Sequence, residues 1–173
     1  MKKVCSWCNK NLGMVNSDMD TEMIITHGLC VECANKIFNA LKIKLPVFLN
    51  TLAAPVVAIS QTGNVLTANR QAQSLLQKEL SDIAGYTGGE VFDCAYSRLP
   101  GGCGNTIHCS GCTIRNTVMD TFQDGQSRMK SPAYLNRGAP GDPQKIALLI
   151  STEKVGDVVL LRIDKVGDDE TAQ

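Results

Sequence analysis

A chain of 173 residues is long enough for one ordinary domain and a small appendage. Its composition, 43% hydrophobic and 20% charged, is typical of globular proteins and excludes a disordered or collagen-like chain. The 17 basic residues balance the 17 acidic ones, so we expect neither nucleic acid nor an anionic membrane surface as a partner. No apolar run is long enough to cross a bilayer, and the N-terminus lacks the apolar core of a secretory signal, which predicts a cytoplasmic protein.

Eight cysteines dominate the chemistry of the chain, and they fall into two groups. In a reducing compartment, grouped cysteines hold metal more often than they form disulfides. We therefore expect eight metal ligands. The first cysteine group is Cys5, Cys8, Cys30 and Cys33, and the second cysteine group is Cys94, Cys103, Cys109 and Cys112.

Residues 1–33 contain the first cysteine group as two CxxC units separated by residues 9–29. Two such units let four thiolates converge in a tetrahedron around one zinc ion. A closed shell of four thiolates is structural, because it leaves no position for a substrate. His27 either replaces one cysteine or lies beside the site, and the complete set of four thiolates favours the second role.

Residues 34–52 are expected to form a linking helix. Apolar residues follow one another at steps of three or four, which indicates a short heptad seam. Pro46 lacks an N–H and is expected to kink or restart the helix. The seam predicts packing either onto the chain's own domain or against a second copy in a homodimer, and the sequence leaves both open. Its members are Phe38, Leu41, Leu45, Phe48 and Leu52.

Residues 53–165 alternate strand and helix signals. The runs 54–59 and 65–68, joined by a Gly-Asn turn, predict a β-hairpin. Residues 145–151 and 157–163 predict two further strands near the end of the domain. Two helices are predicted between these pairs, one with Ala72, Leu75, Leu76 and Leu80 on one face and one with Ile114, Val118, Met119 and Phe122. Residues 166–173 form a polar tail.

The second cysteine group occupies a glycine-rich insert, residues 94–112, with only one CxxC. Uneven gaps and soft ligands favour an iron–sulfur cluster, most simply of the 4Fe–4S type. The predicted helix that starts near Thr113 would place its positive end beside two of the sulfurs, and Arg98 and Arg115 could offset their charge. A second zinc ion and a metal-free thiol switch are the alternatives. His108 is expected to lie beside the ligands rather than among them.

Three segments carry a resemblance to PAS domains: Ala54-Pro55-Val56-Val57-Ala58-Ile59, the run from Gly63 to Ala72, and the closing Arg162-Ile163-Asp164. This resemblance implies an α+β fold, a PAS-like five-stranded antiparallel sheet with helices on one face. Residues 1–33, with His27-Gly28 before the second CxxC, resemble the small zinc module that precedes PAS domains in some bacterial signalling proteins. PAS domains are sensors that bind a cofactor, metabolite or partner and signal through flanking helices.

These observations predict a sensory protein rather than an enzyme. No nucleotide-binding glycine loop or nucleophile elbow occurs, and the CxxC at 109–112 lacks the βαβ context of a thiol oxidoreductase. The sequence predicts a metal-binding PAS-type sensor of redox state, oxygen or metal supply that acts on a separate signalling protein. The alternative is an interaction adaptor stabilised by two structural four-cysteine zinc sites.

Overall fold

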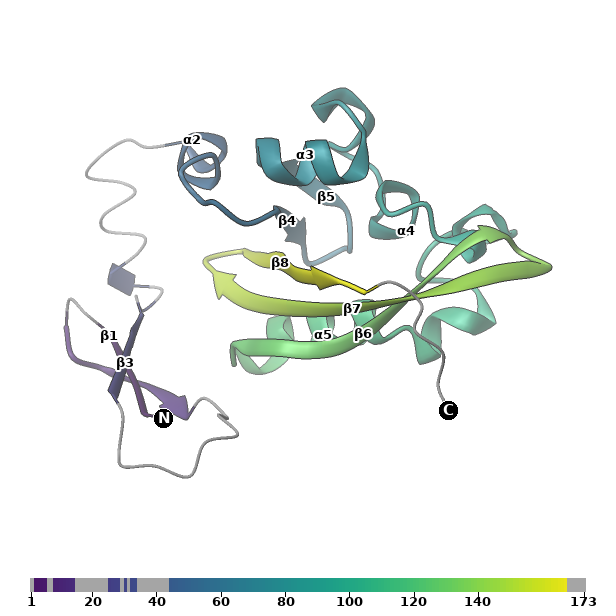
Figure 1. Cartoon of the computed structure of the whole chain (residues 1–173). Helices are drawn as coiled ribbons and strands as arrows, with labels where there is room; N and C mark the ends of the chain where they lie inside the picture. Colours follow the sequence, from purple (N-terminus) through teal and green to yellow (C-terminus); the bar gives the residue numbers. More distant parts are fainter. Residues whose placement is uncertain are drawn as a thin grey trace.

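A computed structural model describes residues 2–5, 8–14, 25–28, 30, 32–33 and 44–167 (Figure 1). The described part of the chain folds as a small N-terminal sheet followed by a larger α+β domain. None of the described helices is long and apolar enough to cross a membrane. In the small sheet the strand order is β2-β1-β3, formed by β1 (Lys2–Cys5), β2 (Asn11–Met14) and β3 (Ile25–Gly28).

The larger domain is built on a five-stranded antiparallel sheet in the order β5-β4-β8-β7-β6. Its first and last strands, β4 and β8, therefore pair side by side at the centre. The predicted hairpin is β4–β5, and the predicted PAS-like sheet is confirmed. The strands are β4 (Val56–Ser60), β5 (Val65–Ala68), β6 (Arg128–Ala139), β7 (Asp142–Val155) and β8 (Val158–Val166).

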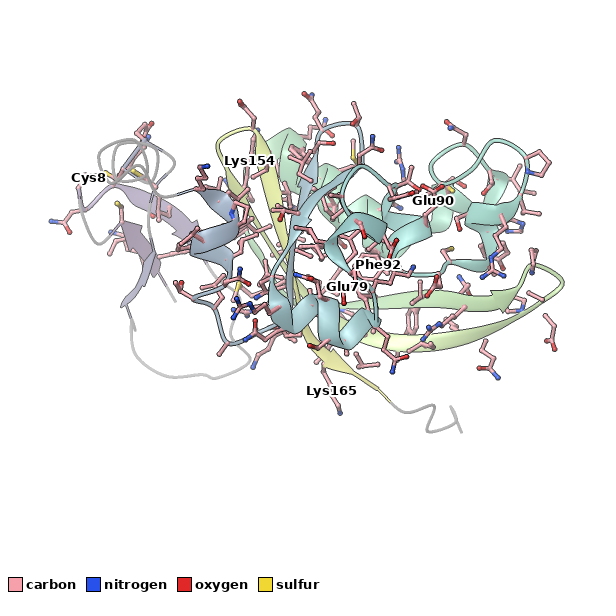
Figure 2. The ribbon with its side chains drawn as sticks, turned by 90° about the horizontal axis from the view of Figure 1, so that it is seen from above. Cys8, Glu79, Glu90, Phe92, Lys154 and Lys165 are labelled. Atoms are coloured by element: carbon pink, nitrogen blue, oxygen red, sulfur yellow. The ribbon has the colours of Figure 1, made fainter. Side chains whose placement is uncertain are left out.

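One face of this sheet packs against α3 (Arg70–Leu76), α4 (Gly88–Val91) and α5 (Thr113–Asp124). Alternate strand residues point to this side because side chains along a strand alternate between faces. Together with Phe92 and Phe122 they form the main core. Figure 2 shows Glu90 of α4, and Phe92 just after this helix, at a distance from Cys8 of the first cysteine group.

The opposite face of β4 is covered by α2 (Leu45–Leu49). Leu49 is fully buried there against Val56 and Ala58, whose side chains point away from the main core. Helix α2 begins at Leu45, and Pro46 lies in its first turn, where a missing N–H costs no helical hydrogen bond. Of the predicted seam, Leu45, Phe48 and Leu52 pack onto this cluster, whereas Phe38 and Leu41 lie outside the described residues.

Two predicted features differ in the structure. The helix expected to include Leu80 ends at Leu76, because Gln77 adopts a left-handed conformation, and Leu80 lies in a separate 3-10 helix. The edge strand β6 had no separate sequence signal, because Arg128–Ala139 is largely polar and contains Pro132. An edge strand tolerates proline, since one side of its backbone needs no sheet partner.

Asn69 joins α2, β4 and α3 through its fully buried side chain. Its amide oxygen accepts hydrogen bonds from the backbone N–H groups of Val56 (2.9 Å) and Ala72 (3.0 Å), and so caps α3. Its amide nitrogen donates to the carbonyl oxygens of Leu49 (3.1 Å) and Ala54 (2.8 Å). One side chain thus satisfies backbone groups on both faces of the sheet.

We predict that Asn69→Ala lowers the free energy of unfolding by about 2–4 kcal/mol, because it removes a helix cap and leaves several buried backbone groups without partners. Urea unfolding measures this change. The matched control is Asn50→Ala, which removes one hydrogen bond, from the exposed backbone N–H of Arg70. A loss no larger in Asn69→Ala than in Asn50→Ala would show that Asn69 has no special structural role.

Candidate metal centres

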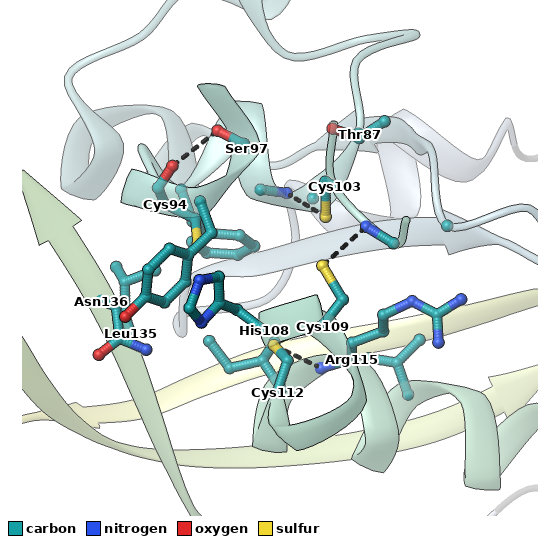
Figure 3. A pocket seen from close by; sticks show the side chains of 18 of the residues that line it. Thr87, Cys94, Ser97, Cys103, His108, Cys109, Cys112, Arg115, Leu135 and Asn136 are labelled. Carbon is teal, nitrogen blue, oxygen red and sulfur yellow. Dashed lines mark hydrogen bonds between the residues drawn. The ribbon is translucent and has the colours of Figure 1, made fainter. Parts of the chain in front are cut away.

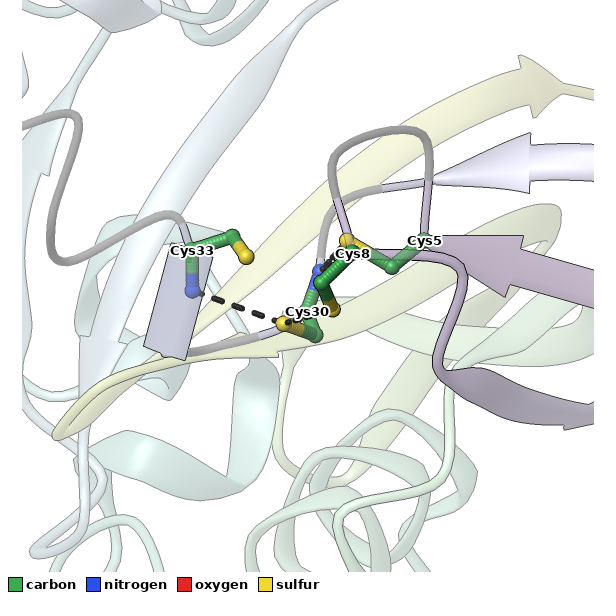
Figure 4. Close-up of side chains that lie close together, drawn as sticks. All are labelled: Cys5, Cys8, Cys30 and Cys33. Carbon is green, nitrogen blue, oxygen red and sulfur yellow. Dashed lines mark hydrogen bonds between the residues drawn. The ribbon is translucent and has the colours of Figure 1, made fainter.

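The first cysteine group converges at the end of the small sheet. The parallel pairing of β1 with β3 sets Cys5 opposite Gly28, so the CxxC units that follow the two strands meet. The four sulfur atoms all lie within 4.8 Å of one another (Figure 4). Sulfurs bonded to one zinc ion at ~2.3 Å would lie about 3.8 Å apart in a tetrahedron, so this geometry fits a single metal ion.

Backbone turns hold these sulfurs in place. The N–H of Cys30 donates to the sulfur of Cys5 (3.3 Å), and the N–H of Cys33 donates to the sulfur of Cys30 (3.4 Å). A separate side-chain hydrogen bond between the thiols of Cys33 and Cys30, together with burial and the other thiols, raises the pKa of Cys33 to about 12. Four such groups become thiolates together only when a cation replaces their protons, so the cluster could hold a metal ion.

The second cysteine group lines a cavity of about 180 Å³ between α5, the insert and the sheet (Figure 3). That volume is about six times the ~30 Å³ of a water molecule. Ile59 of β4 and Leu135 of β6 form part of its wall, so the cavity reaches the inner face of the sheet. Among the described residues, these four cysteines do not meet as closely as the first group does.

Backbone N–H groups point at three of these four sulfurs. The N–H of Gly89 donates to Cys103 (3.3 Å), that of Gly104 to Cys109 (3.1 Å), and that of Arg115 to Cys112 (3.5 Å). Cys112 is the N-cap of α5, as expected from the predicted helix start near Thr113. Hydrogen bonds from backbone amides favour a thiolate over a thiol, and they commonly surround metal-bound sulfur.

The pKa values of three of these thiols are shifted in different directions by burial, hydrogen bonds and charge. Burial raises the pKa of Cys103 and of Cys112, and the N–H donors of Gly89 and Arg115 offset only part of this effect. Burial also raises the pKa of Cys109, but hydrogen bonds from Thr106 and Gly104, together with the charge of Arg115, outweigh it and leave the pKa below its usual value. Cys109 is therefore more readily deprotonated than Cys103 or Cys112.

Glycine is required beside Cys103. A Cβ atom at Gly89 would lie 2.8 Å from both the Cβ and the sulfur of Cys103, and 3.0 Å from the Cβ of Ser97. Non-bonded contacts of a Cβ atom below 3.0 Å essentially never occur, so Cys103 reaches the cavity only because position 89 has no side chain. The sequence analysis drew attention to the glycines of the insert, but Gly89 lies in α4, outside it.

The sequence analysis predicted the positions of some, but not all, of the other residues near the second group. Arg115 lines the cavity, as expected for a residue that offsets thiolate charge, whereas Arg98 is exposed and does not line it. His108 stacks on Tyr96 with ring centroids 3.8 Å apart. This stack, which the sequence did not predict, forms part of the cavity wall. The backbone of His27 pairs with Val4 in the small sheet.

Solved structures of PAS, LOV and photoactive yellow protein domains are similar to this chain at low sequence identity. The LOV protein of Rhodobacter sphaeroides aligns with a TM-score of 0.48 and 12% identity, over 79% of this chain and 70% of its own. The PAS domain of Bordetella pertussis BvgS aligns with a TM-score of 0.47 and 8% identity, over 76% of this chain and 89% of its own. The photoactive yellow protein domain of the Rhodospirillum centenum sensor histidine kinase Ppr aligns with a TM-score of 0.42 and 15% identity, over 70% of this chain and 94% of its own.

The sequence matches no protein-family model and no curated protein. By its own strand order and pairing, the chain has a PAS-like five-stranded antiparallel sheet, preceded by a module with a four-cysteine cluster.

Proposed function

We propose that this chain is a metal-dependent sensory protein whose PAS-like domain holds an iron–sulfur cluster and whose N-terminal module holds a structural zinc ion. The cluster, of the 4Fe–4S type, makes the protein responsive to redox state, oxygen or metal supply. The observation that carries the proposal is the cavity lined by all four cysteines of the second group.

The donor set of this cavity supports a cluster over a second zinc ion. A single zinc ion would draw four sulfurs to about 3.8 Å from one another. The sulfurs of the first group lie within 4.8 Å of one another, whereas those of the second group are spread around a larger space. Iron–sulfur clusters are held by cysteine thiolates and tuned by hydrogen bonds to sulfur. Four soft ligands, three of them with N–H donors, fit such a centre.

Helix α5 offers a route from the cavity to the sheet. Its N-cap is Cys112, and the hydroxyl of Thr113 accepts a hydrogen bond from the N–H of Tyr134 in β6 (2.8 Å). At its other end, Thr121 hydrogen-bonds to Thr152 of β7 (2.7 Å). Loss of the metal–sulfur bond at Cys112 would free the first turn of α5. The expected output is a change in the β6–β7 surface that a separate signalling protein recognises.

The experiment that tests this function is the visible spectrum of protein purified without oxygen. We expect brown protein whose absorbance bleaches when air is admitted, since cluster sulfur-to-iron transitions are lost with the cluster. Cys109→Ser is expected to abolish the colour and to leave the zinc content unchanged. Colourless wild-type protein that contains two zinc ions would refute the proposed function and favour the zinc-stabilised interaction adaptor.

The proposal includes a homodimer formed through residues 34–52. Leu45 and Phe48 of α2, and Leu52 after it, contact the chain's own domain, while Val47 is exposed. We predict that sedimentation shows a dimer at tens of micromolar, roughly the range in which short seams associate. Leu41→Asp is expected to dissociate this dimer, and Lys44→Asp, at an exposed position outside the seam, is the control. A monomeric wild-type protein at that concentration would disprove the dimer.

A further inference from the structure

The four cysteines of the second group are not equivalent. Cys103, Cys109 and Cys112 each accept a hydrogen bond from a backbone N–H, and each of these donors belongs to the ordered cavity wall. Within the described residues, the sulfur of Cys94 accepts no hydrogen bond. Three sulfurs are therefore held by backbone hydrogen bonds, whereas the sulfur of Cys94 is not.

Cys94 also has a backbone contact with the sheet. It is the first residue of the insert, shortly after α4, and it forms an isolated antiparallel bridge with Arg137 of β6. The preceding Asp93 binds Lys78 (2.7 Å) and Arg137 (3.3 Å). The backbone oxygen of Cys94 accepts a hydrogen bond from the hydroxyl of Ser97 (2.7 Å). The backbone of Cys94 is thus linked both to β6, through the bridge with Arg137, and to α4, because its N–H donates to the carbonyl oxygen of Gly89 (2.7 Å).

The cavity wall near Cys94 offers polar groups as well as space. His108, stacked on Tyr96, and Asn136 of β6 line the same cavity as the four cysteines (Figure 3). A small molecule bound in this part of the cavity could receive hydrogen bonds from the imidazole or from the amide. Cys103, Cys109 and Cys112 are held by backbone hydrogen bonds, whereas Cys94 is not. A metal atom bound by Cys94 could therefore exchange this thiolate for another ligand while the other three cysteines stay bound.

We propose that Cys94 is the exchangeable ligand of the second group, and that the iron it holds is the position at which a small exogenous donor such as cyanide or nitric oxide binds. This inference rests on the proposed function. In the exchange with cyanide, the bond between iron and the Cys94 sulfur breaks, a bond between the same iron and the cyanide carbon forms, and the freed thiolate takes one proton from solvent. No electron is transferred.

Exchange at this position has a structural consequence for the hairpin. When Cys94 is bound, it links the metal centre to Arg137 through the β-bridge. When its sulfur leaves the iron, the β6–β7 hairpin loses this link, while the other three cysteines keep the centre in place. The same step therefore binds the small molecule and frees the hairpin.

The test compares wild type, Cys94→Ala and Cys109→Ala, all purified without oxygen. We expect Cys94→Ala to keep most of its iron and sulfide and Cys109→Ala to lose nearly all of both. Cyanide is expected to change the electron paramagnetic resonance spectrum of reduced Cys94→Ala at stoichiometric amounts, and that of wild type only in excess. Circular dichroism checks that each variant is folded.

The outcomes separate the two proposals. Equal loss of iron in Cys94→Ala and Cys109→Ala, with wild type loaded, overturns the role of Cys94 and leaves the proposed function standing. Wild-type protein without iron and sulfide overturns both. If Cys94→Ala does not fold, the wild-type cyanide titration decides: a new spectrum in excess cyanide supports exchange, and an unchanged spectrum overturns it.

Discussion

Replacing Cys33 by serine is expected to remove one zinc ion per chain and to unfold the N-terminal module, while the five-stranded domain stays folded. Structural zinc sites contribute about 10–16 kcal/mol of binding free energy, which is folding free energy in a module this small. The described strands β1, β2 and β3 are four residues each, so packing alone is too weak to hold them. Metal analysis measures the zinc, and limited proteolysis detects cleavage within residues 1–33.

The matched control is Lys10→Ala. Lys10 forms an exposed ion pair with Glu32 (2.8 Å) between the two CxxC units, and it does not contribute a ligand. Exposed ion pairs contribute little to stability, so this variant is expected to keep its zinc and its resistance to protease. Cys5→Ser should behave as Cys33→Ser does. Retention of the full zinc content in both cysteine variants would contradict the structural role of the first group.

The second large effect is expected for Gly89→Ala, which should block the loading of iron at the second group. The added methyl would overlap Cys103, so either Cys103 leaves the cavity or α4 shifts. Overpacking of this kind costs about 1–3 kcal/mol, and it removes one of the four ligands from its position. Iron and sulfide content are expected to fall to near background, while zinc in the first group is unchanged.

Gly88→Ala is an unusually close control for this change. Gly88 is the neighbouring residue in α4, and the nearest atom to an added Cβ is 4.0 Å away. Alanine also favours a helix over glycine by about 1 kcal/mol, so this variant is expected to be as stable as wild type or more so. Normal iron loading in Gly89→Ala would show that Cys103 is not a ligand in this position.

Local sequence signals predicted the features that depend on local geometry. The two CxxC units of the first group define their own turns, so the convergence of four sulfurs followed from spacing alone. The β4–β5 hairpin followed from β-branched residues around the turn at Gly63, which has a positive φ of 87°. Helix α5 followed from its apolar face, and its end at Gly125 uses the left-handed conformation that glycine adopts freely.

The parts that the sequence did not predict depend on contacts between distant segments. The contact of Gly89 with Cys103, the stack of Tyr96 on His108 and the bridge between Cys94 and Arg137 all arise only when the insert folds onto α4 and β6. The strand β6 was missed because only one of its residues, Ala133, is fully buried, so its sequence lacks the apolar alternation of a strand with one face in the core. Lys130, which has a positive φ of 49°, also interrupts the regular strand.

The measurement that tests the central claim most directly is a combined determination of iron, acid-labile sulfide and zinc in wild-type protein purified without oxygen. The account predicts about four iron atoms and about four sulfides per chain, bound at the second cysteine group, together with about one zinc ion at the first. Two zinc ions per chain with neither iron nor sulfide would contradict it, because the second cysteine group would then be a structural zinc site.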